Sequence, residues 1–306
     1  MTSINIPKLV LGSSASLNAI AVIGFGTSSN DSDSAPMKRA VLEAIKLGYR
    51  HFDTASLYGS EQGLGEAIAE ALKLGLVASR DELFITSKLW CSDSHPHLVI
   101  SALKTSLQKL QLEYLDLYLI HFPVSSKPAE NKVYPIDEKD LMPMDFKSVW
   151  AAMEECQQLG LTKSIGVSNF SVDNLQNILS FATIPPSCNQ VGMNPTWQQK
   201  EVREFCGANN IIVTAFSPLG GKGASWGSNV VVDNEVLIDI AKARGKSVAQ
   251  VSLRWVYEQG AGVICKSYNK ERLKENLDIF DWALTQDDLH KISSIPQHKM
   301  NDSPAG

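Results

Sequence analysis

Residues 37–74 read MKRAVLEAIKLGYRHFDTASLYGSEQGLGEAIAEALKL, and they contain a pattern that recurs along the whole chain. Residues 37–46 and 61–74 carry apolar side chains at the i, i+3 and i+4 spacing of an amphipathic helix. Between them, residues 50–53 form a short run that is typical of a strand and ends in Asp53. The segment therefore predicts a helix, a strand and a second helix.

The same alternation continues over the 306 residues, and no internal repeat, low-complexity tract or Gly/Ser linker divides it. Eight strands are expected, at residues 19–23, 50–53, 82–86, 115–120, 163–167, 188–191, 211–215 and 262–264. Further helices are expected at residues 98–110, 146–159, 172–181, 201–209 and 235–256, the last of them broken at Gly245. This order predicts an α/β fold, a single (β/α)8 TIM barrel over residues 1–306, rather than a two-domain Rossmann enzyme.

The charge balance narrows the range of partners. The chain has 28 basic and 33 acidic residues, a formal net charge of −5, and the basic residues are scattered. This distribution offers no basic patch for nucleic acid or an anionic membrane. No apolar run approaches the roughly 18 residues of a membrane span, so a cytoplasmic protein with a small-molecule substrate is expected. The five cysteines include no CxxC pair, and we expect neither a disulfide framework nor a metal site.

Polar residues gather where the predicted strands end, which is where the active site of a TIM barrel lies. They comprise one acid, three basic residues, amide and hydroxyl groups and an aromatic ring: Asp53, Lys88, His121, Ser168, Asn169, Gln190, Phe216, Ser217, Lys266 and Ser267. Three successive strands end near Asp53, Lys88 and His121, and Tyr58 follows five residues after the acid. Each residue alone fits a surface or core position, but packing does not explain three such strand ends together, because buried charges are costly unless paired.

These four side chains are suited to general-acid chemistry. An ammonium group beside a phenol lowers the pKa of the phenol from about 10 toward the working range, so Lys88 is expected to activate Tyr58. Asp53 would hold the ammonium in place. A neutral imidazole at His121 could donate a hydrogen bond to a substrate oxygen and orient it.

Over residues 6 to about 300 the sequence resembles the aldo-keto reductase family. The resemblance rests on GYRHFDTA at 48–55, YGSE at 58–61, ITSKLW at 85–90, DLYLIH at 116–121 and SIGVSNF at 164–170. It implies a catalytic tetrad of Asp53, Tyr58, Lys88 and His121, with Tyr58 as the proton donor. Within the family the sequence is similar to reductases of plant specialised metabolism. YGSEQ at 58–62 and WQQK at 197–200 resemble chalcone reductases, whereas WAAMEECQ at 150–157 and ASWG at 224–227 resemble codeinone reductases.

The resemblance also implies NADPH/NADP+ as the cofactor. Ser168, Asn169 and Gln190 would bind the carboxamide of the nicotinamide, and Phe216 would stack on its ring. Lys266, Ser267 and Arg272 would hold the 2′-phosphate, with Glu275 and Asn276 at the adenine. The full set of expected cofactor-binding residues is Gly26, Thr27, Asp53, Ser168, Asn169, Gln190, Phe216, Ser217, Leu219, Lys266, Ser267, Arg272, Glu275 and Asn276.

Large apolar residues near the strand ends predict a pocket for a bulky carbonyl compound. The expected substrate residues are Leu57, Trp90, His121, Phe122 and Trp226, with loops 124–145 and 218–232; Trp90 and Trp226 fit core packing equally well. The family resemblance implies a monomer. If the chemistry is that of a chalcone reductase, the substrate would come from a partner polyketide synthase.

Other features of the sequence are compatible with different functions. The same barrel serves as a redox-sensing, cofactor-binding subunit of potassium channels, so a non-catalytic NADPH-binding module remains an alternative. His95 and His97 imitate a metal-binding pair, but Pro96 between them is typical of a helix start. The glycines at 24 and 26 resemble a Rossmann loop only in part, since the third glycine and the following acid are missing.

Overall fold

The computed structural model describes residues 5–12, 18–28, 34–221, 227–300 and 304. Eight parallel strands close into a barrel, and β12 pairs back to β3. In order around the barrel they are β3 (Ile23–Gly26), β4 (His51–Asp53), β5 (Phe84–Leu89), β6 (Leu117–Ile120), β9 (Ile165–Ser168), β10 (Cys188–Gly192), β11 (Ile212–Phe216) and β12 (Gly262–Cys265). The predicted (β/α)8 barrel is confirmed.

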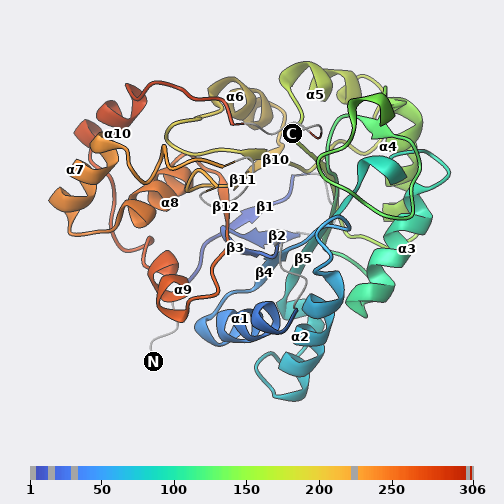
Figure 1. Cartoon of the computed structure of the whole chain (residues 1–306), viewed down its shortest axis with the longest axis horizontal. Coiled ribbons are helices and arrows are strands. Elements are labelled where there is room, and N and C mark those ends of the chain that lie inside the picture. The colour runs from blue at the N-terminus through green and yellow to red at the C-terminus, as the bar shows by residue number, and fades with distance from the viewer. Residues whose placement is uncertain (1–4, 13–17, 29–33, 222–226, 301–303, 305–306) are drawn as a thin grey trace.

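Helices surround the barrel on its outside (Figure 1). They are α1 (Ser34–Leu47), α2 (Glu61–Lys73), α3 (Val99–Leu110), α4 (Phe146–Gln158), α5 (Val172–Leu179), α6 (Lys200–Ala208), α7 (Glu235–Arg244), α8 (Val248–Glu258), α9 (Lys270–Leu277) and α10 (Gln286–Ser293). The expected break at Gly245 is confirmed, because this residue ends α7 in the left-handed conformation with φ of 60°. The sequence analysis did not single out α9, whose apolar stripe is too short to show helical spacing: only Leu273, Asn276 and Leu277 are buried.

The first strand was misplaced by the sequence analysis. Residues 19–23 do not form one barrel strand: β2 (Ala19–Ala21) pairs antiparallel with β1 (Lys8–Val10), and the barrel strand β3 begins only at Ile23. The apolar run spans both elements because both are buried, so periodicity could not separate them. Figure 1 shows the hairpin across the centre of the barrel, where Leu11 and Ile20 pack against Leu117 and Leu119. The hairpin therefore covers the end of the barrel opposite the site.

The strands show the alternation that a barrel requires. In β6, Leu117 and Leu119 belong to the cluster inside the barrel, whereas Tyr118 and Ile120 belong to the core beneath the helices. The strand expected at 82–86 instead runs from Phe84 to Leu89, after a 3-10 turn η1 (Arg80–Glu82), so Lys88 lies within β5 rather than beyond it. Among the described residues, no helix is long and apolar enough to cross a membrane.

Candidate active site

The four catalytic candidates meet at one end of the barrel because three of them come from neighbouring strands. Asp53 is the last residue of β4, Lys88 lies near the end of β5, and His121 follows β6 directly. β5 pairs with both β4 and β6. Tyr58 stands on the loop between β4 and α2. The topology thus assembles the predicted group at the C-terminal ends of the strands.

A buried ion pair forms the base of the site. Lys88 Nζ lies 2.5 Å from Asp53 Oδ1 and donates to the Thr54 carbonyl oxygen at 2.9 Å, while Gln190 Nε2 donates to Asp53 Oδ2 at 2.8 Å. Lys88 is 0% exposed and Asp53 is 3% exposed. A buried pair is stable only when further hydrogen bonds satisfy both partners, as they do here. Burial opposes the charge of Lys88, but Asp53 and Tyr58 together raise its pKa, so the ammonium persists at neutral pH.

The Tyr58 hydroxyl and the His121 ring lie above this pair. Tyr58 Oη is 3.4 Å from His121 Nε2, and the two rings meet edge to face with centroids 5.6 Å apart. Lys88 Nζ lies 5.0 Å from the centre of the Tyr58 ring. A phenol, an imidazole and an ammonium therefore surround one position at the barrel mouth, where a substrate oxygen could be protonated.

The electrostatics of Tyr58 and His121 follow from burial. Burial lowers the pKa of His121 well below 6.5, and the nearby Lys88 lowers it further, so the ring is neutral at neutral pH. Burial also raises the pKa of Tyr58 above 10, and the lowering effect of Lys88 does not compensate. The expected influence of Lys88 has the right sign, but the expected net shift of the phenol is wrong. The cause is desolvation, which the sequence does not reveal.

Three hydroxyl groups hold the loop that carries Tyr58. Thr27 Oγ1 donates to the Asp53 carbonyl oxygen at 3.0 Å, and Ser60 Oγ lies 2.8 Å from Thr27 Oγ1 and 2.9 Å from Thr54 Oγ1. These bonds join β3, β4 and the start of α2. Thr27 was expected to contact the cofactor, but its hydroxyl forms hydrogen bonds within the protein. The sequence did not point to Thr54 and Ser60: Ser60 precedes Glu61 as an N-cap residue would, but its side chain makes no capping hydrogen bond and contacts the two threonines instead.

Amide and hydroxyl groups from β9 and β10 form the neighbouring part of the barrel mouth. Asn169, with φ of 63°, donates from Nδ2 to the His121 carbonyl oxygen at 3.0 Å, and Ser168 Oγ donates to the Gln190 carbonyl oxygen at 2.8 Å. Asn169 Oδ1 is buried and has no hydrogen-bond partner. A buried acceptor without a donor is costly, so this atom is suited to receive an N–H from a bound group such as a carboxamide.

The next strand ends bring the remaining nicotinamide candidates to the same rim. Phe216 ends β11 and is half-buried, and Ser217 follows it in the left-handed region with φ of 48°. Leu219 is half-buried in the following turn. Gly26 ends β3 and lies close to the neighbouring strand β12, since a Cβ at residue 26 would lie 3.1 Å from Ile264 Cγ2. The half-buried ring of Phe216 can therefore take a flat ligand against its face.

The candidates for the phosphate and adenine follow β12. Lys266 is exposed and donates to the Ser28 carbonyl oxygen at 2.7 Å, and Ser267 Oγ accepts from the Asn269 backbone at 3.1 Å. Arg272 and Glu275 are exposed on α9. Asn276 lies apart from them, because it is buried and donates from Nδ2 to Cys265 Sγ at 3.4 Å. Two exposed cations beside a hydroxyl form a set of donors that a phosphate dianion requires.

An aromatic cluster lines the other side of the tetrad. Trp90 and Phe122 are both buried and meet edge to face at 5.8 Å, and the Trp90 ring lies 5.1 Å from that of His121. Leu57 packs against the same cluster, together with residues from loop 124–145 that the sequence analysis did not name individually: Val124, Tyr134, Ile136 and Leu141. Within this loop, β7 (Ser125–Ser126) pairs with β8 (Leu141–Met142). An apolar wall therefore stands directly beside His121.

Two further sequence-based expectations concern residues near this wall. Trp226, with part of loop 218–232, lies outside the described residues. His95 Nε2 lies 2.8 Å from the Ser126 carbonyl oxygen, and the rings of His95 and His97 are 6.1 Å apart. In the part of the chain that the structure describes, no group of three or more His, Cys, Asp or Glu side chains is placed to hold a metal.

Comparison with known proteins agrees with this geometry. The model of the aldo/keto reductase family matches residues 22–297. The NAD(P)H-dependent 6′-deoxychalcone synthase of Glycine max is 59% identical over 99% of this chain and 95% of its own length. The NADPH-dependent codeinone reductase 1-4 of Papaver somniferum is 57% identical over 99% of this chain and 94% of its own length.

Solved structures resemble the chain over almost its full length. The aldose reductase of Schistosoma japonicum gives a TM-score of 0.86 at 32% identity, and the aldo-keto reductase of Bombyx mori in complex with NADP gives 0.82 at 36%. Each alignment covers 96% of this chain and 94% of the other. The family resemblance seen in the sequence is confirmed: this chain is an oxidoreductase that belongs to the aldo/keto reductase family.

Proposed function

We propose that the chain is an NADPH-dependent carbonyl reductase that acts on an aldehyde or ketone of a bulky plant specialised metabolite. One observation carries this proposal: the Tyr58 hydroxyl lies 3.4 Å from His121 Nε2, above the buried Lys88–Asp53 pair. The named relatives support the cofactor and the substrate class, since they include NADPH-dependent codeinone reductases and a 6′-deoxychalcone synthase.

In this mechanism each member of the tetrad has a distinct role. Tyr58 donates the proton: its phenol is protonated at neutral pH, and Lys88 favours loss of the proton by opposing the rise in pKa that burial causes. His121 stays neutral and orients the carbonyl oxygen toward Tyr58 by a hydrogen bond. Lys88 places a positive charge under the oxygen as negative charge develops, and Asp53 fixes the ammonium. When bound, NADPH supplies the hydride for the carbonyl carbon.

The chain holds the cofactor along the strand ends between β9 and α9. Asn169, with its unpartnered Oδ1, binds the carboxamide together with Ser168 and Gln190. Phe216 supports the nicotinamide ring. At the opposite end Lys266, Ser267 and Arg272 bind the 2′-phosphate, a charge that NADH lacks. With the cofactor held by these residues, the carbonyl substrate would meet a completed site.

The substrate stands against the wall formed by Leu57, Trp90 and Phe122. This surface is apolar and aromatic, with the polar tetrad at one end. Such a pocket favours a large, mostly apolar carbonyl compound over a free sugar. Polyketide and alkaloid ketones are the first compounds to test, because the relatives are named for these classes.

The direct test follows NADPH oxidation by absorbance against a panel from a reactive aromatic aldehyde to bulky alkaloid ketones. Tyr58→Phe is measured in parallel. We expect the wild type to turn over and Tyr58→Phe to lose about 10²- to 10⁴-fold in kcat, with NADPH binding retained, since only the proton donor is removed. Tight NADPH binding without turnover on any compound would favour either the non-catalytic binding module or a reductase that depends on a partner synthase. If the coupled assay described below also gives no turnover, the reductase is contradicted.

We also propose that the protein works as a cytoplasmic monomer and, for a polyketide substrate, beside a partner synthase. Light scattering of the purified protein tests the oligomeric state, and a fluorescent fusion in plant cells tests the compartment. A coupled assay tests the partner: the reductase is added to a working chalcone-type synthase, and the deoxygenated product is measured. Turnover in the coupled assay without turnover on finished chalcones is the expected result for this substrate class.

A further inference from the structure

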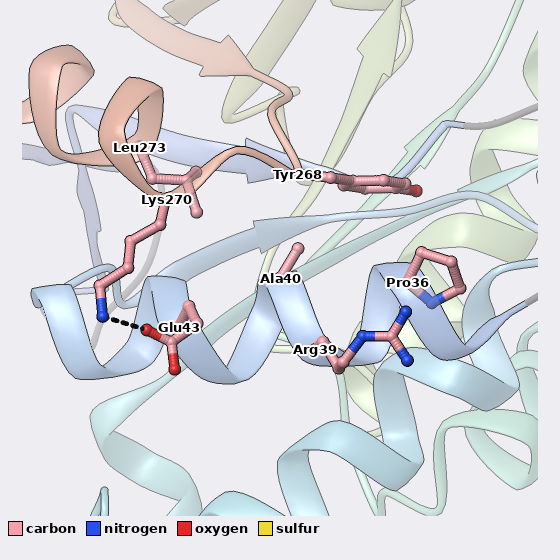
Figure 2. A pocket seen from close by; sticks show the side chains of 7 residues that line it. All are labelled: Pro36, Arg39, Ala40, Glu43, Tyr268, Lys270 and Leu273. Carbon is pink, nitrogen blue, oxygen red and sulfur yellow. Dashed lines mark ion pairs between the residues drawn. The ribbon is translucent and has the colours of Figure 1, made fainter.

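A shallow cavity of about 150 Å³ lies outside the barrel mouth, between α1 and the segment that leads into α9. Figure 2 shows it as a slot with Tyr268 on one side and α1 on the other. The lining residues are Pro36, Arg39, Ala40, Glu43, Tyr268, Lys270 and Leu273. Its upper side belongs to the segment proposed above for the 2′-phosphate, so the cavity borders the cofactor site without containing the tetrad.

The two ends of this cavity differ in how their cations are paired. At one end Lys270 Nζ lies 3.0 Å from Glu43 Oε2, and Glu43 also accepts from Lys46 at 2.8 Å. Lys270 is thus tied to a carboxylate that it shares with Lys46. At the other end stands Arg39, which is exposed and takes part in none of the ion pairs or hydrogen bonds found among the described residues. Figure 2 shows its guanidinium beside Pro36, at the end of the slot away from Lys270 and Glu43.

Tyr268 connects this guanidinium to the expected phosphate-binding residues. Lys266 Nζ lies 5.2 Å from the centre of the Tyr268 ring, and Arg39 lines the cavity on which the same ring borders. Arg272 follows four residues later on α9 and is exposed. Arg39 therefore lines a cavity that borders on the segment 266–272, which itself carries Lys266 and Arg272. Their combined field favours a multivalent anion, and it acts over about 8 Å at physiological ionic strength.

We propose that Arg39 of α1 is a further determinant of cofactor specificity, which attracts the 2′-phosphate of NADPH from the α1 side of this cavity. The inference rests on the proposed function, because it concerns the same cofactor. Among the described residues Arg39 has no carboxylate partner, whereas Lys270 is paired with Glu43. Its effect must therefore appear with the phosphorylated cofactor and be small with NADH, which lacks the dianion.

The test is a binding measurement on Arg39→Ala and Arg39→Lys. Fluorescence titration gives Kd for NADPH and NADH, and calorimetry gives Kd for adenosine 2′,5′-bisphosphate. Lys38→Ala is the matched control, because Lys38 is a neighbouring cation on α1 that pairs with Glu70 at 2.9 Å instead of facing the cavity. We expect Arg39→Ala to raise Kd for NADPH and the bisphosphate about 3- to 5-fold, the range for one exposed charge pair.

The remaining expectations separate charge from shape. Arg39→Lys should recover most of the affinity, Kd for NADH should change by less than about twofold, and 1 M salt should abolish the difference between wild type and Arg39→Ala. An equal loss of NADH and NADPH binding in Arg39→Ala would overturn the inference about Arg39 but not the proposed function. The same holds if Arg39→Ala leaves Kd for NADPH unchanged while Arg272→Ala raises it. If the wild type does not prefer NADPH to NADH, the proposed function itself is wrong.

Discussion

At the scale of single residues, the site depends on two opposite charges kept out of water. Lys88 and Asp53 are both almost fully buried, and each is satisfied by one further hydrogen bond, from the Thr54 carbonyl and the Gln190 amide respectively. Removing one partner leaves the other charge buried and unpaired, which costs more than removing both. The pair should therefore show strong coupling when its members are replaced singly and together.

Lys88→Met should destabilise the protein by about 3–5 kcal/mol, because the carboxylate of Asp53 loses its counter-charge. The double variant Lys88→Met with Asp53→Asn should recover a large part of this loss. Urea unfolding followed by circular dichroism measures both, with Lys104→Met, an exposed lysine on α3, as the control. Additive effects of the two single variants would show that the pair is not coupled.

At the scale of elements, helix ends place the loops around the barrel. Gly245 ends α7 with φ of 60°, and Ser247 and Gln250 begin α8 with a capping box two residues later. The backbone turns sharply there because only glycine adopts this conformation without strain. The long helical pattern is thus divided into two helices, α7 and α8, rather than one continuous helix.

Gly245→Ala should lower the free energy of unfolding by about 1–2 kcal/mol through backbone strain alone. A Cβ at this position meets no atom within 4 Å, so no steric clash contributes. Gly207 on α6 is the matched control, since a Cβ there also meets nothing within 4 Å, but its φ is not in the left-handed region. Gly207→Ala should be neutral or slightly stabilising. Equal effects of the two substitutions in thermal unfolding would refute the explanation.

At the scale of the whole molecule, closing the barrel buries ionisable groups that the unfolded chain exposes. His51 on β4 is 1% exposed, and burial lowers its pKa from 6.5 to about 4. Gly24 on β3 makes room for this ring, since a Cβ there would lie 2.4 Å from His51 Nδ1. His121 is lowered in the same direction by burial and by Lys88. Folding therefore excludes protons from both rings.

This exclusion predicts how stability depends on pH. The unfolded chain protonates His51 below about pH 6.5 while the folded chain does not, so stability falls as the pH decreases from 6.5 toward 4. His51 alone should account for about 3 kcal/mol over this interval. Urea unfolding at a series of pH values measures the slope, which His51→Gln should reduce. His290→Gln, at an exposed position on α10, should leave it unchanged; an equal slope in all three proteins would contradict the argument.

Much of this architecture was readable from the chain itself. The alternation of apolar runs and amphipathic segments predicted the barrel, because each strand and helix buries a face of fixed period regardless of its partners. Strand ends carrying Asp53, Lys88 and His121 predicted the tetrad, since parallel strands in one barrel end at one rim. The break at Gly245 followed from local backbone preference. These features depend on residues that are close in sequence, so they can be predicted from the sequence.

Other features exist only once distant segments meet. The boundary between β2 and β3 is set by packing, because the β1–β2 hairpin packs against residues inside the barrel. Both β2 and β3 are apolar, so the sequence does not show where one ends. The raised pKa of Tyr58 depends on how much water the closed site excludes. The unpartnered Asn169 Oδ1 depends on strand ends that meet at the barrel mouth, and the cavity beside Arg39 depends on α1 and α9, which come from opposite ends of the chain. Solvation and long-range contacts arise from tertiary packing, so local sequence patterns do not predict them.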